Sequence, residues 1–105
     1  MRTKFSILPS VYTISCNDKN VKDFYIGSCN NFNNRYKEHK YGSLHNIPRK
    51  VNQMFVYKMI RANGGWSNWT MKSEVFLEYD CDWNTRRELE QIYIDLLEPT
   101  LNRSR

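Results

Sequence analysis

The chain has 105 residues with a formal net charge of +5 at pH 7, and 14% of its residues are aromatic. This length predicts one small domain with a modest core, over residues 1–105, and the aromatic content excludes a disordered chain. No apolar run is long enough to span a bilayer, and Pro9 interrupts the apolar stretch near the N-terminus. We therefore expect neither a membrane-spanning helix nor a signal peptide.

The three cysteines, Cys16, Cys29 and Cys81, are widely spaced and lack a C-x-x-C pair. An odd number at this spacing is typical of reduced thiols and not of a disulfide framework or a zinc site. We therefore expect an intracellular protein, in the cytoplasm or nucleus of its own cell or of a host cell.

Positive charge is concentrated in the first part of the chain. Residues 1–62 hold eleven Lys and Arg against three Asp and Glu, whereas residues 63–105 hold five against eight. A basic half suits a polyanionic partner such as DNA. The residues predicted to contact that partner are Lys37, Lys40, Arg49, Lys50, Lys58 and Arg61.

Two strands are predicted first along the chain. Residues 10–15 alternate polar and apolar side chains, and residues 24–28 are rich in aromatic and β-branched ones. The segment between them is rich in turn-forming residues, so the strands are predicted to pair as an antiparallel hairpin. Asn30 or Asn31 is then predicted to cap a helix that runs to about Tyr41, with Gly42 as its stop.

The second half of the chain predicts two further helices and one strand. Residues 51–62 carry apolar side chains at helical spacing and precede two glycines, and residues 69–79 alternate as a strand does. Thr85 is predicted to cap the last helix through a capping box with Glu88, and Pro99 follows its end. The order β-β-α-α-β-α predicts an α+β domain in which helices flank a small three-stranded antiparallel sheet.

Glu90 is the first candidate for chemistry, because it falls inside the apolar arc of the last predicted helix. A carboxylate on the buried side of a helix is costly unless it is paired or binds a metal ion. The simpler alternative is an internal ion pair with Arg86, four residues earlier. The helix by itself leaves both interpretations open.

Arg35 and His39 are spaced i, i+4 on the first predicted helix and flank the stripe formed by Phe32 and Tyr36. Both are therefore expected to point toward the sheet. An arginine can clamp a phosphate through two hydrogen bonds, and a histidine can relay a proton near neutral pH. The alternative is an arginine stacked on an aromatic ring and a histidine at the border of the core.

Tyr12 and Tyr25 lie in the two predicted hairpin strands, where a tyrosine is ordinarily a core residue. A phenol near an arginine and a metal-bound water has its charged form favoured. A pKa lowered from its usual value of about 10 would make one of these tyrosines a usable base. Asn102 is either a turn residue or an amide that fastens the C-terminal tail against the last helix.

Together and in this order, these residues resemble the GIY-YIG endonuclease family, in particular its homing-endonuclease branch. The first motif is matched with Ser10 in place of its first glycine, and the second is matched without substitution. Ser28 follows the second motif where the DNA-repair branch has a lysine. The resemblance spans residues 11–102 and rests on Ser10-Val11-Tyr12, Tyr25-Ile26-Gly27, Arg35, His39, residues 60–64, Glu90 and the closing Glu98–Asn102 segment.

The resemblance implies hydrolysis of DNA phosphodiester bonds with one divalent ion, Mg²⁺ or Mn²⁺, per active site. Glu90 would be the only protein ligand of the ion, and Arg35 would hold the scissile phosphate. Tyr12 would deprotonate the attacking water with His39 as proton relay, and Tyr25 would position that water. Whether Tyr12 or His39 is the base is left open.

Asn102 would give structural support, and no separate DNA-binding domain fits in the remaining residues. Sequence specificity would then be weak or come from a partner protein or a homodimer. The alternative function is a catalytically silent nucleic-acid-binding module on the same fold, which the presence of all the motif residues argues against. A merely basic protein-interaction domain would require the motif residues to coincide by chance.

Overall fold

The computed structural model describes residues 7–48 and 51–102 of the chain. The predicted α+β class and element order are confirmed, with a short 3₁₀ turn added before the third strand. The elements are β1 (Ser10–Cys16), β2 (Phe24–Cys29), α1 (Phe32–His45), α2 (Val51–Ala62), η2 (Trp66–Asn68), β3 (Trp69–Phe76) and α3 (Trp83–Leu97).

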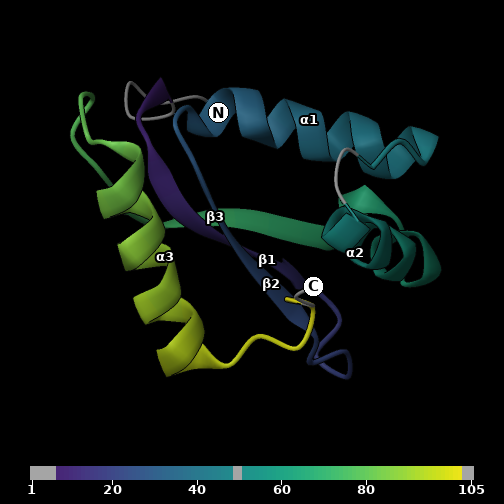
Figure 1. Cartoon of the computed structure of the whole chain (residues 1–105). Helices are drawn as coiled ribbons and strands as arrows, with labels where there is room; N and C mark the ends of the chain where they lie inside the picture. Colours follow the sequence, from purple (N-terminus) through teal and green to yellow (C-terminus); the bar gives the residue numbers. More distant parts are fainter. Residues whose placement is uncertain (1–6, 49–50, 103–105) are drawn as a thin grey trace.

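The three strands form one antiparallel sheet with the order β2-β1-β3, so β1 is central and β2 is an edge strand. Tyr12 pairs with Gly27 and Ile14 pairs with Tyr25 across the hairpin. Side chains alternate between the two faces of a sheet, so these four residues share one face. Figure 1 shows α1 and α2 on one side of the sheet and α3 on the other.

The main core lies between the sheet and the helices α1 and α2. Tyr12 and Ile14 are fully buried there against Val56, Tyr57 and Ile60 of α2. Burial of a large apolar side chain contributes about 1.5–3 kcal/mol. The apolar spacing of residues 51–62 correctly predicts a helix, but it does not identify the buried face, because Val56, Tyr57 and Ile60 face the sheet whereas Met54 is 56% exposed.

The predicted start of α1 is confirmed, whereas its predicted end is wrong. The side chain of Asn31 accepts a hydrogen bond from the backbone N–H of Asn34 at 3.0 Å. The helix passes through Gly42 and ends at His45, where Asn46 takes a left-handed conformation with φ 56°. Position 42 is a glycine because a Cβ there would lie 2.7 Å from the Tyr57 ring, so this glycine serves close packing and does not stop the helix.

The start of α3 and the end of β3 also differ from the prediction. Asp82, not Thr85, caps α3, and its carboxylate accepts a hydrogen bond from the backbone N–H of Thr85 at 2.7 Å. Asp is a stronger N-cap than Thr, so the helix begins earlier. Strand β3 ends at Phe76 rather than at residue 79.

Replacing Gly42 with Ala tests the close packing of α1 on Tyr57. Alanine gains up to about 1 kcal/mol in helix propensity, but the clash with the buried ring costs about 1–3 kcal/mol. We expect a net loss of about 1 kcal/mol in the free energy of unfolding, measured by urea denaturation. Lys37→Ala, on the exposed side of the same helix, is the control and should change stability little. A stabilised Gly42→Ala variant would contradict this packing.

Candidate active site

A pocket of about 240 Å³ opens where the edge strand β2 meets the helices. It brings together three of the five predicted catalytic residues, Tyr25 of β2, Arg35 of α1 and Glu90 of α3. These residues are far apart in sequence and converge only in the fold. The whole lining consists of Tyr25, Ser28, Arg35, Gln53, Trp83, Arg86, Arg87 and Glu90.

Ser28 links the two charged catalytic candidates. Its hydroxyl donates to Oε1 of Glu90 at 2.5 Å, and its carbonyl accepts from Nη1 of Arg35 at 3.2 Å. Nε of Arg35 also lies 3.0 Å from Oε1 of Glu38. The alternative ion pair between Glu90 and Arg86 is not formed, since neither of the ion pairs seen in the described residues joins them. Arg35 and Glu90 are thus held on either side of Ser28.

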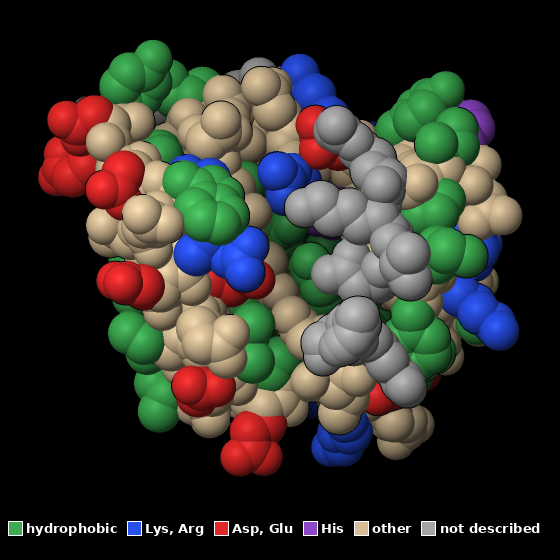
Figure 2. Space-filling view, in the orientation of Figure 1, with side chains coloured by type: hydrophobic (Ala, Val, Ile, Leu, Met, Phe, Trp, Pro, Cys, Tyr) green, Lys and Arg blue, Asp and Glu red, His purple; other side chains and the backbone are tan. Residues whose placement is uncertain are grey.

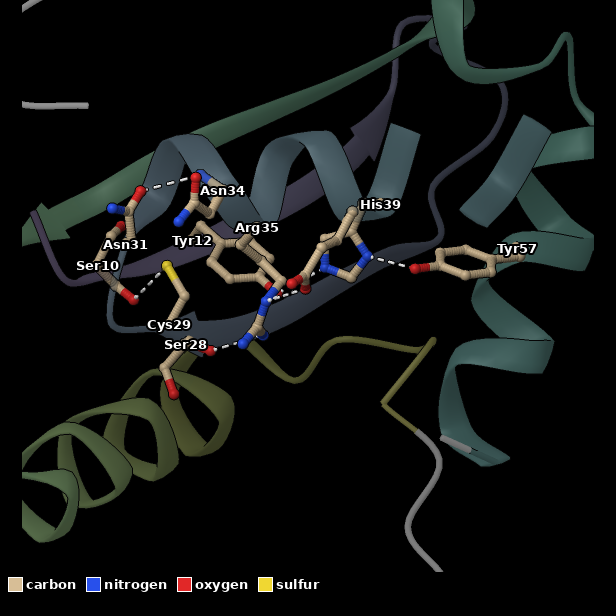
Figure 3. Close-up of polar contacts among 10 residues, drawn as sticks. Ser10, Tyr12, Ser28, Cys29, Asn31, Asn34, Arg35, His39 and Tyr57 are labelled. Atoms are coloured by element: carbon tan, nitrogen blue, oxygen red, sulfur yellow. Dashed lines mark hydrogen bonds and ion pairs between the residues drawn. The ribbon is translucent and has the colours of Figure 1, made fainter. Parts of the chain in front are cut away.

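Tyr12 and His39 lie behind the pocket wall and form part of a buried chain of hydrogen bonds (Figure 3). The hydroxyl of Tyr12 is 2.7 Å from Nε2 of His39, and Nδ1 of His39 is 2.8 Å from the hydroxyl of Tyr57. All three side chains are at most 1% exposed. The chain connects β1, α1 and α2 through one imidazole, which confirms the predicted inward orientation of His39.

The pKa values of the two tyrosines are raised, whereas the sequence suggested that a phenol pKa would be lowered. Burial, and then the neighbouring Tyr25, raise the pKa of Tyr12 well above 10, and Arg35 offsets only part of this. Burial and the carboxylate of Glu90 raise the pKa of Tyr25 to about 12. Burial and Arg35 lower the pKa of His39 to about 3. At neutral pH both phenols keep their protons and His39 is neutral.

Gly27 is the last residue of the second motif, and the rings of Tyr12 and Tyr25 leave no room for a side chain at this position. A Cβ at this position would lie 2.5 Å from the hydroxyl of Tyr12 and 2.9 Å from the Tyr25 ring. The rings of Tyr12 and Tyr25 have their centroids 6.4 Å apart. Any side chain at Gly27 would therefore displace the hydroxyl that contacts His39.

The sequence model of the GIY-YIG catalytic domain matches residues 8–103. The chain belongs to the GIY-YIG family. No curated protein and no solved structure matches the chain significantly. A GIY-YIG catalytic domain is a nuclease domain, so the pocket around Arg35 and Glu90 is the candidate site of phosphodiester cleavage in this GIY-YIG chain.

Asn102 fastens the C-terminal tail to strand β2, not to the last helix as expected. Its Oδ1 accepts from the backbone N–H of Ile26 at 2.8 Å, and its Nδ2 donates to the carbonyl of Ile26 at 2.7 Å. Leu101 adds a backbone hydrogen bond to Phe24 at 3.0 Å. The tail thus pairs with the otherwise free edge of the GIY-YIG sheet, next to Tyr25.

Four of the six residues predicted to contact DNA are among the described residues, and these four lie outside the pocket. Their side chains are exposed, which agrees with a surface role, and none of them lines the pocket. Arg49 and Lys50 lie outside the described residues. The four exposed ones are Lys37, Lys40, Lys58 and Arg61.

Tyr57 and the residues of α3 that line the pocket beside Glu90 were not predicted from the sequence. Tyr57 lies on the face of α2 that packs on the sheet, which the predicted apolar pattern did not include, and a glycine inside α1 at position 42 is the signal of a ring packed against that helix. Arg86 was assigned to an ion pair with Glu90 that does not form. Trp83 and Arg87 form a cation–π contact of 5.0 Å at the pocket rim, and nothing in their spacing indicated it.

The donors of the pocket suit a metal ion that draws most of its ligands from elsewhere. Among the described residues no three His, Cys, Asp or Glu side chains cluster, and Glu90 is the carboxylate of the pocket. Magnesium binds through one or two carboxylates and completes its shell with water and phosphate oxygens. The residues present therefore fit a Mg²⁺-type ion bound together with a phosphate.

No helix in the described part of the chain is long and apolar enough to cross a membrane.

The low pKa of His39 predicts that stability falls in mild acid. Below about pH 6.5 the unfolded chain binds a proton at this imidazole that the folded chain does not bind. The free energy of unfolding should therefore fall as the pH drops from 6.5, with a slope that approaches about 1.4 kcal/mol per pH unit near pH 5. Urea denaturation of His45→Gln, which keeps only the buried imidazole, should give the same slope. Stability that is flat over this window would contradict a neutral, buried His39.

Proposed function

We propose that this GIY-YIG chain is a metal-dependent DNA endonuclease in which Glu90 holds one divalent ion, Mg²⁺ or Mn²⁺. The observation that carries the proposal is the convergence of Glu90, Arg35 and Tyr25 in one pocket. The basic surface of α1 and α2 supports DNA as the substrate, and the GIY-YIG family is generally metal-dependent.

Glu90 would bind the ion through its carboxylate while the hydroxyl of Ser28 fixes the orientation of that carboxylate. When bound, the ion supplies positive charge that stabilises the phosphate and the departing oxygen. Glu90 is half-buried and forms no ion pair with another described residue, so its charge is available for such a ligand. One protein carboxylate leaves the remaining positions to water and to the substrate phosphate.

Arg35 would hold the scissile phosphate. Its side chain is about 30% exposed and is fixed by hydrogen bonds to the Ser28 carbonyl and to Glu38. These contacts use part of the guanidinium, which has five N–H donors in all. The free donors can bind a phosphate oxygen on the pocket side, and a fixed guanidinium stabilises charge that develops in the transition state.

Tyr12 and His39 would remove the proton from the attacking water as one unit, and because both lie behind the pocket wall, that water would have to reach the Tyr12 phenol past Tyr25. The phenol of Tyr12 is protonated, so it can accept that proton only as its own proton passes to Nε2 of His39. Neutral His39 has an unprotonated ring nitrogen, but its pKa of about 3 disfavours the imidazolium, so His39 would hold the proton only transiently. Tyr25, which lines the pocket and packs beside both residues, would position the water. Asn102 would support the site through the edge of β2.

The alternative is a nucleic-acid-binding module on the same fold that does not cleave. It shares the basic surface and the arginines of the pocket but has no use for the carboxylate of Glu90. Tests of Glu90 and Tyr12 therefore separate the two functions. Sequence specificity would be weak, or it would come from a partner protein or a homodimer.

Glu90→Gln tests the metal site, because it keeps the shape of the side chain and removes its charge. We expect the rate of DNA cleavage to fall by on the order of 10³-fold or more, since a catalytic metal supplies several kcal/mol of charge stabilisation. Chelation of the divalent ion should have the same effect on the wild type. Fluorescence anisotropy with labelled DNA should show that binding is retained. Glu88→Gln, on the exposed side of the same helix, is the control. A Glu90→Gln variant that cuts at the wild-type rate would end the assignment.

Tyr12→Phe tests the proton path with the loss of a single oxygen atom. We expect single-turnover cleavage to slow by about 10²–10⁴-fold, the usual contribution of a positioned base, with little change in DNA affinity. Tyr79→Phe, at a tyrosine that is 80% exposed, is the matched control. If Tyr12→Phe cuts at full speed and Tyr25→Phe does not, the base is the phenol that lines the pocket.

A further inference from the structure

Arg86 lies one helical turn before Glu90 on α3 and lines the same pocket. Its Nε atom is buried and has no hydrogen-bond partner in the part of the chain that the structure describes. A buried donor without an acceptor costs free energy, and a guanidinium carries a full positive charge in addition. The fold therefore tolerates an unfavourable group beside Glu90, and an acceptor oxygen from a ligand would remove this cost.

The internal partner that the spacing offers is not used. Residues four apart on a helix are neighbours, yet the carboxylate of Glu90 accepts its hydrogen bond from Ser28 and forms no ion pair with Arg86. Arg86 is thus in reach of an opposite charge on its own helix and remains available to the pocket. This arrangement is typical of a binding residue and not of a structural ion pair.

The charges of the pocket wall select an anionic ligand. Arg35, Arg86 and Arg87 line it against the single carboxylate of Glu90. Figure 2 shows Lys and Arg side chains on two sides of the hollow near the centre of the face in view. Arg35 comes from α1 and Arg86 from α3, and both line the pocket together with Ser28 of β2. A polyanionic strand that crosses the pocket would meet both guanidinium groups.

We propose that Arg86 is a second phosphate ligand, which binds the phosphate next to the one held by Arg35. Nε and one Nη of an arginine form a fork that matches two phosphate oxygens, so a turn of the side chain toward the ligand would give the buried Nε–H an acceptor. This inference rests on the proposed nuclease function for the identity of the ligand as a DNA strand. The contact with Arg86 on α3 would place the DNA strand across the carboxylate of Glu90.

The test compares Arg86→Met with the wild type, both in the Glu90→Gln background, which prevents cleavage. Binding of a labelled DNA duplex is measured by fluorescence anisotropy over a series of salt concentrations. We expect Arg86→Met to weaken binding by about 10-fold or more and to reduce the log–log salt slope by roughly 0.9. Lys72→Met removes one charge from a side chain on β3 that is 67% exposed, and it should change the affinity less than twofold. Arg86→Lys keeps the charge but loses the fork, so its affinity should fall between the two.

Thermal unfolding separates a binding role from a structural one. Arg86→Met removes a buried donor without a partner and keeps most of the apolar stem, so the melting temperature should stay the same or rise. A clear drop in melting temperature would show that Arg86 holds the fold together and would overturn the proposal. So would an unchanged DNA affinity and salt slope.

The failure of this inference can be distinguished from the failure of the proposed function. If the wild type binds DNA but does not cut it with Mg²⁺ or Mn²⁺, the nuclease function is refuted, and a weaker Arg86→Met complex would still support the phosphate contact. If cleavage occurs and Arg86→Met binds as the wild type does, only the Arg86 assignment is overturned. A wild type that does not bind DNA at all would overturn both.

Discussion

A buried chain of three polar side chains joins the central strand to the two helices that cover one face of the sheet. Tyr12, His39 and Tyr57 are almost completely buried, so their polar atoms must find partners inside the protein. The imidazole between the two phenols fixes the distance and the angle between the strand, α1 and α2. Gly27 and Gly42 leave room for the two phenol rings, which explains a glycine within a strand and another within a helix.

The pocket lies at the edge of the sheet because the side chains of three layers meet there. Strand β2 is flanked by β1 on one side and by the C-terminal tail, held through Asn102, on the other. Ser28 near the end of this strand contacts α1 through Arg35 and α3 through Glu90. A rigid edge strand therefore sets the separation of the arginine and the carboxylate, and the helices supply the charge.

The same pocket concentrates what is unfavourable for folding. It holds three guanidinium groups, one carboxylate and a buried donor without a partner on Arg86, whereas the core behind it is well packed. Natural proteins depart from optimal stability at functional sites, where a ligand supplies the missing interactions. A polyanion bound with a divalent ion would satisfy these charges. The groups that bind the ligand are therefore the ones that lower the stability of the free protein.

The sequence by itself determined the class of the fold, the order of its elements and the positions of the motif residues, because hydrophobic periodicity and turn residues are local properties. It did not determine where α1 ends and α3 begins, because Gly42 serves close packing against Tyr57 inside α1 and Asp82 is a stronger cap than Thr85. Only the tertiary structure joined Tyr57 to a histidine 18 residues away, left Arg86 without an internal partner and raised the pKa of Tyr12. Each of these depends on burial and on distances between separate elements, which residue spacing within one element does not encode.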